Sequence, residues 1–273
     1  MKIQFRKNEK LAYMTVAGVV ILLLLAGVLL NWQRGAFTNN MLLLLSLLLG
    51  VLFFLEIYFL CIEKEEKYIL EKKRVRSVWR MSKQIVQTLV KTIDAKDSYT
   101  NGHSARVAQY SLMLAKRMDF SSEELGRLEY TALLHDVGKI GVSDAILNKK
   151  GKLTDEEYAI IKEHANMGAQ ILSNITELPD VAVGARYHHE RYDGNGYPAG
   201  LKGEEIPLFA RIIAVADSYD AMTSKRSYRA ALPQHLVREE ISKGIGTQFD
   251  PQIAKLMLMI MDEDIAYELR EIE

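Results

Sequence analysis

Residues 133–141 read LLHDVGKIG, and the adjacent His135 and Asp136 decide the interpretation of the whole chain. Both side chains can bind a metal ion, yet they follow leucines typical of a buried helix. Further histidines and one further aspartate occur in comparable surroundings, beside a carboxylate, a glycine turn or an apolar helical face. These residues are His103, His164, His188, His189 and Asp217. Imidazole and carboxylate together suit iron, manganese, zinc and related ions. The pattern therefore predicts a metal site assembled from several helices.

A buried histidine–aspartate network without metal is the alternative for any one of these residues. It explains all seven together less well, because so many desolvated ionisable groups need a strong compensating charge. Seven ligands also exceed what one tetrahedral ion needs, so we expect two ions bridged by Asp136 and a water. Lys139 follows His135 by one helical turn and is expected to reach a phosphate oxygen. Interaction of a helix-end lysine with the helix dipole is its alternative role.

The composition excludes some classes of protein. The chain has 273 residues, enough for one sizeable core or two small ones. Its 35 basic and 35 acidic residues balance, which argues against binding to a nucleic acid polymer but leaves room for a local phosphate pocket. The single cysteine, Cys61, excludes an intrachain disulfide and a cysteine-rich zinc module. Cys61 lies at the end of an apolar run, and we expect it to serve as a small apolar residue rather than as a lipidation site.

Two apolar runs, residues 11–30 and 41–62, predict an N-terminal membrane anchor of two transmembrane helices. About 20 apolar residues span a bilayer, and these runs do not alternate like barrel strands. The first run is too long for the apolar part of a signal peptide, and no cleavage site follows it. Basic residues flank the pair, whereas the connection 31–40 carries only Arg34. The positive-inside bias then predicts a multi-pass protein of the inner (plasma) membrane, surrounded by lipid, with its C-terminal domain in the cytoplasm.

Residues 63–93 are predicted to form a charged linker helix, because they lack glycine and proline and are rich in helix formers. Apolar residues recur along it with an imperfect spacing of three and four. They are Ile69, Val75, Val78, Ile85, Leu89 and Ile93. This spacing is compatible with a homodimer that pairs through the linker helix, and equally with a solvated stalk that packs on the globular part.

The remainder, residues 94–273, is predicted to be an all-α domain. Apolar residues at helical spacing fill 82–95, 103–118, 121–137, 154–173, 179–190, 207–222, 233–244 and 251–260. No segment alternates convincingly as a strand. His164 is expected to share a helical face with Ile160, Ile161, Gly168 and Ile171, and so to point into the core. The irregular stretch 191–206, with four glycines and one proline, predicts a sharply turning loop near the His188–His189 pair.

Seven blocks of this sequence resemble the HD-GYP family, a branch of the HD-domain metal-dependent phosphohydrolases. They are KDSYTNGHSARV, LLHDVGKIGVSDAIL, GKLTDEEY, HHERYDGNGYPAGLKGEEIP, RIIAVADSYDAMTS, RSYR and GTQFDP, in the family's order and spacing over residues 90–261. The resemblance implies a helical-bundle HD core and a centre of iron or manganese. It also implies hydrolysis of cyclic di-GMP, a second messenger of bacterial signal transduction.

The resemblance also implies a role for each site residue. The implied metal ligands are His103, His135, Asp136, His164, His188, His189 and Asp217. Lys139 would contact the scissile phosphate or the attacking water, Tyr197 and Pro198 would line the substrate pocket, and Arg226 and Arg229 would hold the phosphates. Some members carry a glutamate four residues before the first histidine and bind a third ion. Tyr99 occupies that position here, so two divalent ions are expected.

The leading hypothesis is a membrane-anchored, metal-dependent phosphodiesterase. A hydroxide bridging the two ions would attack phosphorus of cyclic di-GMP, with Asp136 holding the ions and Lys139 stabilising the developing charge. The product would be the linear dinucleotide, with further cleavage to GMP as an open question. One alternative is an HD hydrolase of another cyclic dinucleotide or nucleotide. The other is an interaction module that senses the nucleotide without cleaving it.

Overall fold

The computed structural model describes residues 18–19, 23, 25–27, 29–30, 39–97, 102–224, 231–264 and 269. Within these ranges the regular elements are helices, and the only β-type pairing is an isolated bridge between Ile245 and Phe249. The expected all-α class is therefore confirmed. The chain divides into two compact units, Met1–Met81 and Ser82–Glu273, and each is described by itself.

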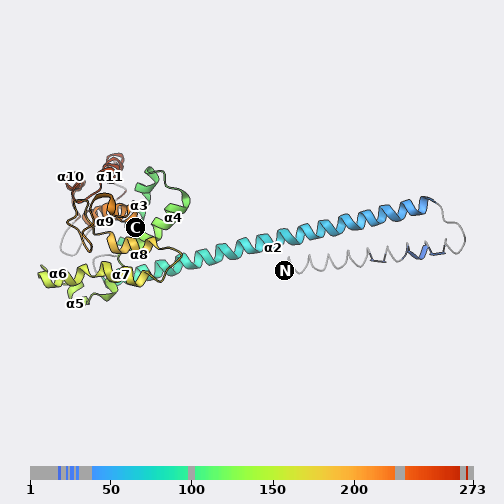
Figure 1. Cartoon of the computed structure of the whole chain (residues 1–273), viewed down its shortest axis with the longest axis horizontal. Coiled ribbons are helices and arrows are strands. Elements are labelled where there is room, and N and C mark those ends of the chain that lie inside the picture. The colour runs from blue at the N-terminus through green and yellow to red at the C-terminus, as the bar shows by residue number, and fades with distance from the viewer. Residues whose placement is uncertain are drawn as a thin grey trace. The chain divides into compact units, whose positions relative to one another are not determined.

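The first unit contains most of one long helix, α2 (Asn39–Lys96), which Figure 1 shows without a break. Its apolar part is rich in leucine and is largely exposed from Leu44 on, and α2 is the one helix among the described residues long and apolar enough to cross a membrane. The other expected span, residues 11–30, lies largely outside the described residues, so the pair of transmembrane helices stays a prediction. The expected boundaries after residues 62 and 93 both fall inside α2. Pairing with a second copy also stays a prediction.

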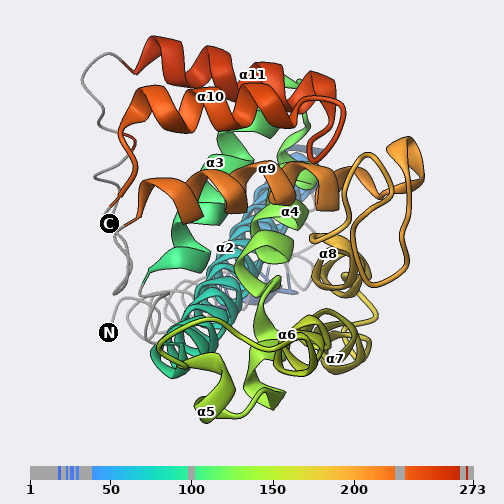
Figure 2. The same cartoon turned by 90° about the vertical axis from the view of Figure 1, so that its left-hand side faces the viewer.

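The second unit is a bundle of short helices (Figure 2). They are α3 (His103–Arg117), α4 (Ser122–Leu134), α5 (Asp144–Leu147), α6 (Asp155–Lys162), α7 (His164–Leu172), α8 (Asp180–Tyr187), α9 (Leu208–Thr223), α10 (Gln234–Gly244) and α11 (Pro251–Glu263), with the 3₁₀ turns η1 (Val137–Gly141) and η2 (Gly203–Glu205). Local sequence signals explain several helix starts. Thr154 and Glu157 form the expected capping box before α6. Asp250 accepts hydrogen bonds from two backbone N–H groups at the start of α11, where Pro251 follows.

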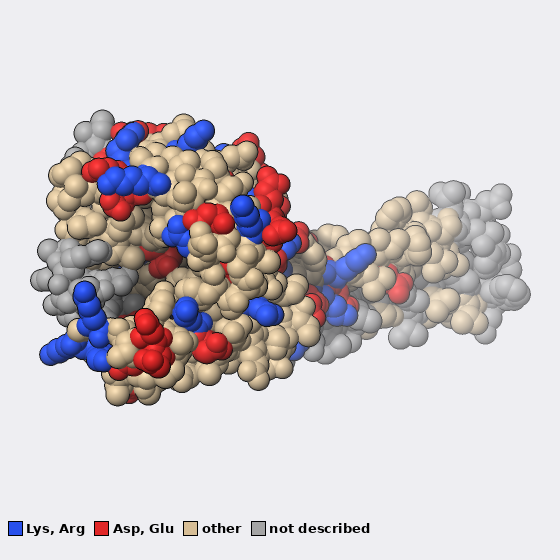
Figure 3. All heavy atoms as spheres, turned by 60° about the vertical axis from the view of Figure 1, so that its left-hand side comes forward, with Lys and Arg blue, Asp and Glu red and all other residues tan. Residues whose placement is uncertain are grey.

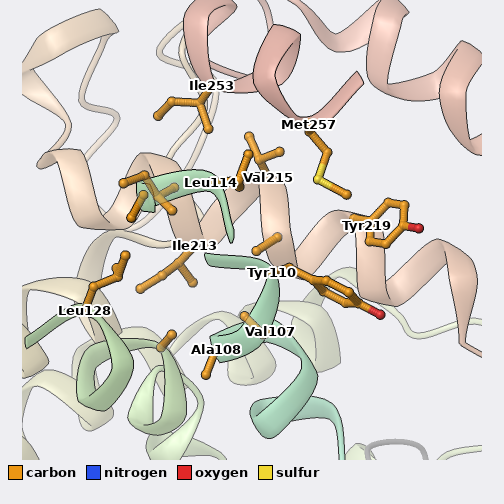
Figure 4. Close-up of a cluster of buried hydrophobic side chains, with 14 of the residues drawn as sticks. Val107, Ala108, Tyr110, Leu114, Leu128, Ile213, Val215, Tyr219, Ile253 and Met257 are labelled. Carbon is orange, nitrogen blue, oxygen red and sulfur yellow. The ribbon is translucent and has the colours of Figure 1, made fainter. Parts of the chain in front are cut away.

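Helix α9 is the centre of the core. In Figure 2 it lies between the pair α10 and α11 on one side and α4 on the other, with α3 running across it, and it contacts all four. Figure 4 shows Ile213, Val215 and Tyr219 of α9 among side chains from α3, α4 and α11. The ring of Tyr219 meets the edge of Tyr110 at a centroid distance of 4.9 Å. This packing leaves α9 little freedom, which fixes the position of the polar residues it carries.

The single helix expected over 154–173 is wrong. The N–H of Glu163 bonds to the carbonyl of Ile160, which ends α6, and α7 begins at His164. The expected shared face is therefore only partly present: Ile160 and Ile171 are 45% and 39% exposed. His164 and Gly168 of α7 are both buried, so the expectation that His164 points into the core is confirmed. The break coincides with close packing of η1 against the first turn of α7. A Cβ atom at Gly138 would lie 1.9 Å from the carbonyl oxygen of His164.

Candidate metal centre

Most of the expected ligands stand at helix ends, and the bundle brings these ends together. His103 and His164 are the first residues of α3 and α7, and His135 and His188 immediately follow α4 and α8. Asp217 differs, because it lies within α9. A residue at a helix end can point along the axis, so several helices can each direct one ligand to a common point. All seven expected ligands converge, six from the ends of helices and Asp217 from within α9.

The ligand atoms fall into two groups. One contains Asp136, His164, His188 and His189, and the other contains His103, His135 and Asp217. Within each group the nitrogen and carboxylate oxygen atoms all lie within 4.8 Å of one another. Each group therefore has the size and the donor set of a site for one transition-metal ion.

The carboxylate of Asp136 lies between the two groups. Its Oδ1 atom is 3.4 Å from Nε2 of His164 and 3.7 Å from Nε2 of His188. Its Oδ2 atom is 3.4 Å from Nε2 of His135 and 3.7 Å from Nε2 of His103. One oxygen thus faces each group, which is the arrangement a bridging carboxylate requires.

Hydrogen bonds on the far side of the rings set which nitrogen is available. The Nδ1 atoms of His135, His164 and His188 lie 2.7, 2.6 and 2.9 Å from the backbone carbonyls of Ala132, Ile161 and Ala185. A carbonyl only accepts, so Nδ1 carries the proton in each ring. The Nε2 lone pairs then point to the centre, as metal-ligating histidines require.

One buried atom indicates that an ion belongs here. The Nε2 atom of His135 is fully buried and makes no hydrogen bond with any described residue. Leaving such a nitrogen unsatisfied is costly, and a metal ion would supply its partner. The surrounding donors are imidazole nitrogen and carboxylate oxygen without sulfur, a set that fits iron, manganese or zinc.

The electrostatics of the centre also favour a cation. Burial lowers the pKa of His164 to about 4 and that of His189 well below its usual range, so both rings stay neutral and able to bind metal. Burial also acts to lower the pKa of His103, but Asp136, Asp220 and Asp217 raise it to about 10. A proton at His103 thus balances the carboxylates, and a metal ion competes with it for the same nitrogen.

Asp220 contacts one of the expected ligands, and the sequence interpretation missed it. Its carboxylate is buried, and Oδ2 lies 2.7 Å from Nδ1 of His103. Arg106 donates from Nε to the other oxygen at 2.6 Å, which holds that carboxylate in place. Asp220 therefore orients the ring of His103 in the way backbone carbonyls orient the other histidines. The available signal was its spacing of three residues from Asp217 in an otherwise apolar helix.

Glu190 was also missed, and it organises the glycine-rich loop. Its buried carboxylate accepts hydrogen bonds from the backbone N–H groups of Ala199, Gly200 and Leu201 at 2.7, 3.1 and 3.1 Å. The loop folds back so tightly that a Cβ atom at Gly196 would lie 2.3 Å from the backbone nitrogen of Arg191. This folding places the ring of Tyr197 against that of His189, with centroids 4.8 Å apart.

A cavity of about 1090 Å³ opens over the centre. Its lining includes His103, Asp136, Lys139, His164, Tyr197 and Asp217, whereas Pro198 does not line it. Figure 3 shows this face of the molecule hollowed, with acidic atoms inside the hollow and basic atoms around it. Arg226, Arg229 and Tyr99 lie outside the described residues, so their expected roles stay predictions.

Lys139 belongs to the centre rather than to a helix end. Its Nζ atom lies 2.7 Å from Oδ2 of Asp136 and 3.0 Å from Oδ2 of Asp97. Burial acts to lower the pKa of Lys139, but the two carboxylates raise it above its usual value, so the ammonium stays charged. A fixed positive charge at the cavity wall suits the binding of a phosphate group.

Comparison with known proteins assigns this arrangement to a family. Residues 87–253 match the HD domain family. The 3'3'-cGAMP-specific phosphodiesterase 3 of Vibrio cholerae is 41% identical over 183 residues, which cover 66% of this chain and 40% of that protein. A cyclic di-GMP phosphodiesterase of Thermotoga maritima is 39% identical over 183 residues, 66% of this chain and 50% of that protein. The chain thus spans half or less of these relatives. The crystal structure of the V. cholerae phosphodiesterase V-cGAP3 has the same fold, with a TM-score of 0.53 at 21% identity over 67% of this chain and 49% of that one.

Proposed function

Because the chain belongs to the HD domain family, in its HD-GYP branch, we propose that it is a metal-dependent phosphodiesterase that hydrolyses cyclic di-GMP. The observation that carries the proposal is the position of Asp136. Its two carboxylate oxygens face two separate groups of ligand atoms at the floor of a cavity. Two-metal centres of this kind are suited to displacement at phosphorus.

The residues of the chain have distinct roles in this reaction. Two ions, iron or manganese, would activate water and polarise the phosphoryl group when bound. Asp136 would hold both ions, and the ammonium of Lys139 would stabilise negative charge on the phosphoryl oxygens. Tyr197, stacked on His189, offers an aromatic surface to a nucleobase. Arg226 and Arg229 hold the phosphates. Hydrolysis of one diester bond gives the linear dinucleotide, and hydrolysis of the second gives GMP.

The cavity supports a dinucleotide substrate by its size. At about 1090 Å³ it exceeds the range of roughly 300–1,000 Å³ usual for pockets that bind drug-sized ligands. A mononucleotide would leave much of this space unfilled. The lining contains aromatic side chains that suit the bases and cationic side chains that suit the phosphates. Its metal-ligating side chains suit the scissile bond.

A second substrate, 3'3'-cGAMP, is favoured by the 41%-identical relative, which is named as specific for it. This molecule differs from cyclic di-GMP in one base, so the same centre would cleave both. An interaction module without turnover is less favoured, because all seven ligand side chains are present and converge.

The deciding experiment is turnover by the full-length protein in detergent, loaded with Mn²⁺ or Fe²⁺ and supplied separately with cyclic di-GMP and 3'3'-cGAMP. We expect linear product by chromatography, and no product after chelation. His135→Ala should lower turnover at least about 100-fold, since it removes a ligand. His235→Ala is the matched control, because His235 is exposed on α10, outside the centre. Metal-loaded protein that binds but does not cleave either nucleotide would instead support the interaction module.

We propose that residues 11–30 and 41–62 anchor the protein in the plasma membrane, with the phosphodiesterase domain in the cytoplasm. The exposed apolar stretch of α2 and the basic residues around the two runs support this orientation. A reporter fused after Glu273 should read as cytoplasmic, and one inserted between residues 31 and 40 should read as external. An external reading after Glu273 would contradict the proposed orientation and separate the enzyme from a cytoplasmic messenger.

A further inference from the structure

The last turns of α2 are an integral part of the second unit. Val90 and Ile93 are buried in it. Asp94 accepts a hydrogen bond of 2.9 Å from the hydroxyl of Ser104 on α3. Burial of these residues fixes the end of α2 in position and rotation relative to the metal centre.

Lys96 ties the same end of α2 to η1, the turn that carries Lys139. Its Nζ atom donates to the backbone carbonyls of Ile140 and Val142, both at 2.6 Å. In return, the side-chain amide of Asn148 donates to the carbonyl of Lys96 at 3.0 Å. Hydrogen bonds from Lys96 of α2 therefore fix the backbone that follows Lys139.

Asp97 continues the last turn of α2, since its N–H bonds to the carbonyl of Ile93. Its carboxylate is buried, lines the cavity and contacts Nζ of Lys139 at 3.0 Å. The same ammonium contacts Oδ2 of Asp136 at 2.7 Å. A chain of alternating charges thus runs from α2 through Lys139 to the carboxylate between the two ligand groups.

This row of charges bears on one oxygen atom that both Lys139 and a metal ion would contact. Oδ2 of Asp136 faces His103 and His135 and is needed by an ion there, yet the ammonium of Lys139 also contacts it. Two cations close to one oxygen repel each other. Asp97 offers the ammonium a second carboxylate, which keeps the flexible lysine side chain at the cavity wall when Asp136 binds metal.

We propose that Asp97 is a positioning residue that holds Lys139 for the reaction and makes activity depend on the placement of α2. This inference rests on the proposed function of the same centre. Movement of the last turn of α2 would shift Asp97 and η1 together. The helix that contains the expected membrane span is therefore connected to Lys139 through Asp97 and through the bonds of Lys96 to η1.

The test compares Asp97→Asn, Asp97→Glu and Lys139→Ala in the full-length protein loaded with Mn²⁺. Asn preserves the shape but removes the charge, so kcat should fall about 30–100-fold, the scale of a misplaced charged donor. KM should stay within about twofold, and metal content should be unchanged, because Asp97 does not belong to either ligand group. Glu should restore part of the rate, because it returns the carboxylate.

The double variant Asp97→Asn with Lys139→Ala separates positioning from general stability. If Asp97 acts through Lys139, the double variant should be no slower than Lys139→Ala alone. Lys83→Ala is the matched control, since Lys83 also joins α2 to the domain, through an ion pair of 2.7 Å with Glu129. It should behave as the unsubstituted protein. Additive losses in the double variant, or loss of metal with Asp97→Asn, would overturn the inference.

A simple diester, bis(4-nitrophenyl) phosphate, distinguishes this inference from the proposed function. Cleavage of the simple diester but of no cyclic dinucleotide would overturn the proposed function, while the effect of Asp97→Asn on that cleavage still tests the positioning role. Unchanged rates for Asp97→Asn on both substrates would overturn the positioning role alone. No cleavage of either substrate by the metal-loaded protein would overturn both.

Discussion

Replacement of Asp136 by alanine is expected to remove at least one metal ion per chain and to lower turnover roughly 1000-fold, about 4 kcal/mol of barrier. The reason is geometric, because the two oxygens of this carboxylate face the two ligand groups separately. Histidines alone would also leave each ion with less compensating negative charge. Elemental analysis of the purified protein and steady-state turnover measure the two effects.

The control for this variant is Asp262→Ala, which removes an exposed carboxylate of α11 that pairs with Arg238 of α10 and belongs to neither ligand group. It should keep both metal content and rate. Active protein that contains no metal would contradict the entire two-ion interpretation. An Asp136→Ala variant that retains two ions would show that the other ligands suffice and that Asp136 does not bridge.

Replacement of Gly138 by alanine is expected to lower both stability and metal content. The added Cβ would lie 1.9 Å from the carbonyl oxygen of His164 and 2.5 Å from the backbone nitrogen of Gly168. Backbone atoms cannot yield as a flexible side chain would, so η1 and α7 must separate. We expect a loss of about 3 kcal/mol in the free energy of unfolding, and a fall in Tm of about 6–12 °C. His164 would move away from Asp136, which weakens one ligand group.

Gly126→Ala is the matched control for this prediction. Gly126 lies within α4, and a Cβ there meets nothing within 4 Å. Alanine in a helix interior is favoured over glycine by about 1 kcal/mol, so this variant should be unchanged or slightly more stable. Thermal unfolding and metal analysis of both variants check the contrast. Equal stability of Gly138→Ala and the unsubstituted protein would show that η1 and α7 do not pack as described.

The sequence was sufficient to predict which residues could bind metal, but not which other side chains contact them. Histidines and aspartates on apolar stretches can be recognised without coordinates, because burying such groups without a purpose is costly. Asp97 was missed because an aspartate at the end of a charged helix resembles any surface acid, and the spacing of Asp220 from Asp217 does not say which residue Asp220 contacts. Their partners, Lys139 and His103, are 42 and 117 residues away in the chain, and no local pattern encodes such contacts.

Some helix boundaries likewise follow from adjacent residues, whereas others depend on tertiary packing. The capping residues Thr154 and Asp250 act locally, so the starts of α6 and α11 follow from a few adjacent residues. The break at Glu163 does not follow from adjacent residues, and it occurs where Gly138 of η1 packs closely against His164. The residue types by themselves determined the all-α class, the donor set and the need for a cation. Only the tertiary structure decided that one carboxylate lies between two ligand groups and that α2 reaches Lys139, because distances between remote side chains depend on how whole helices pack.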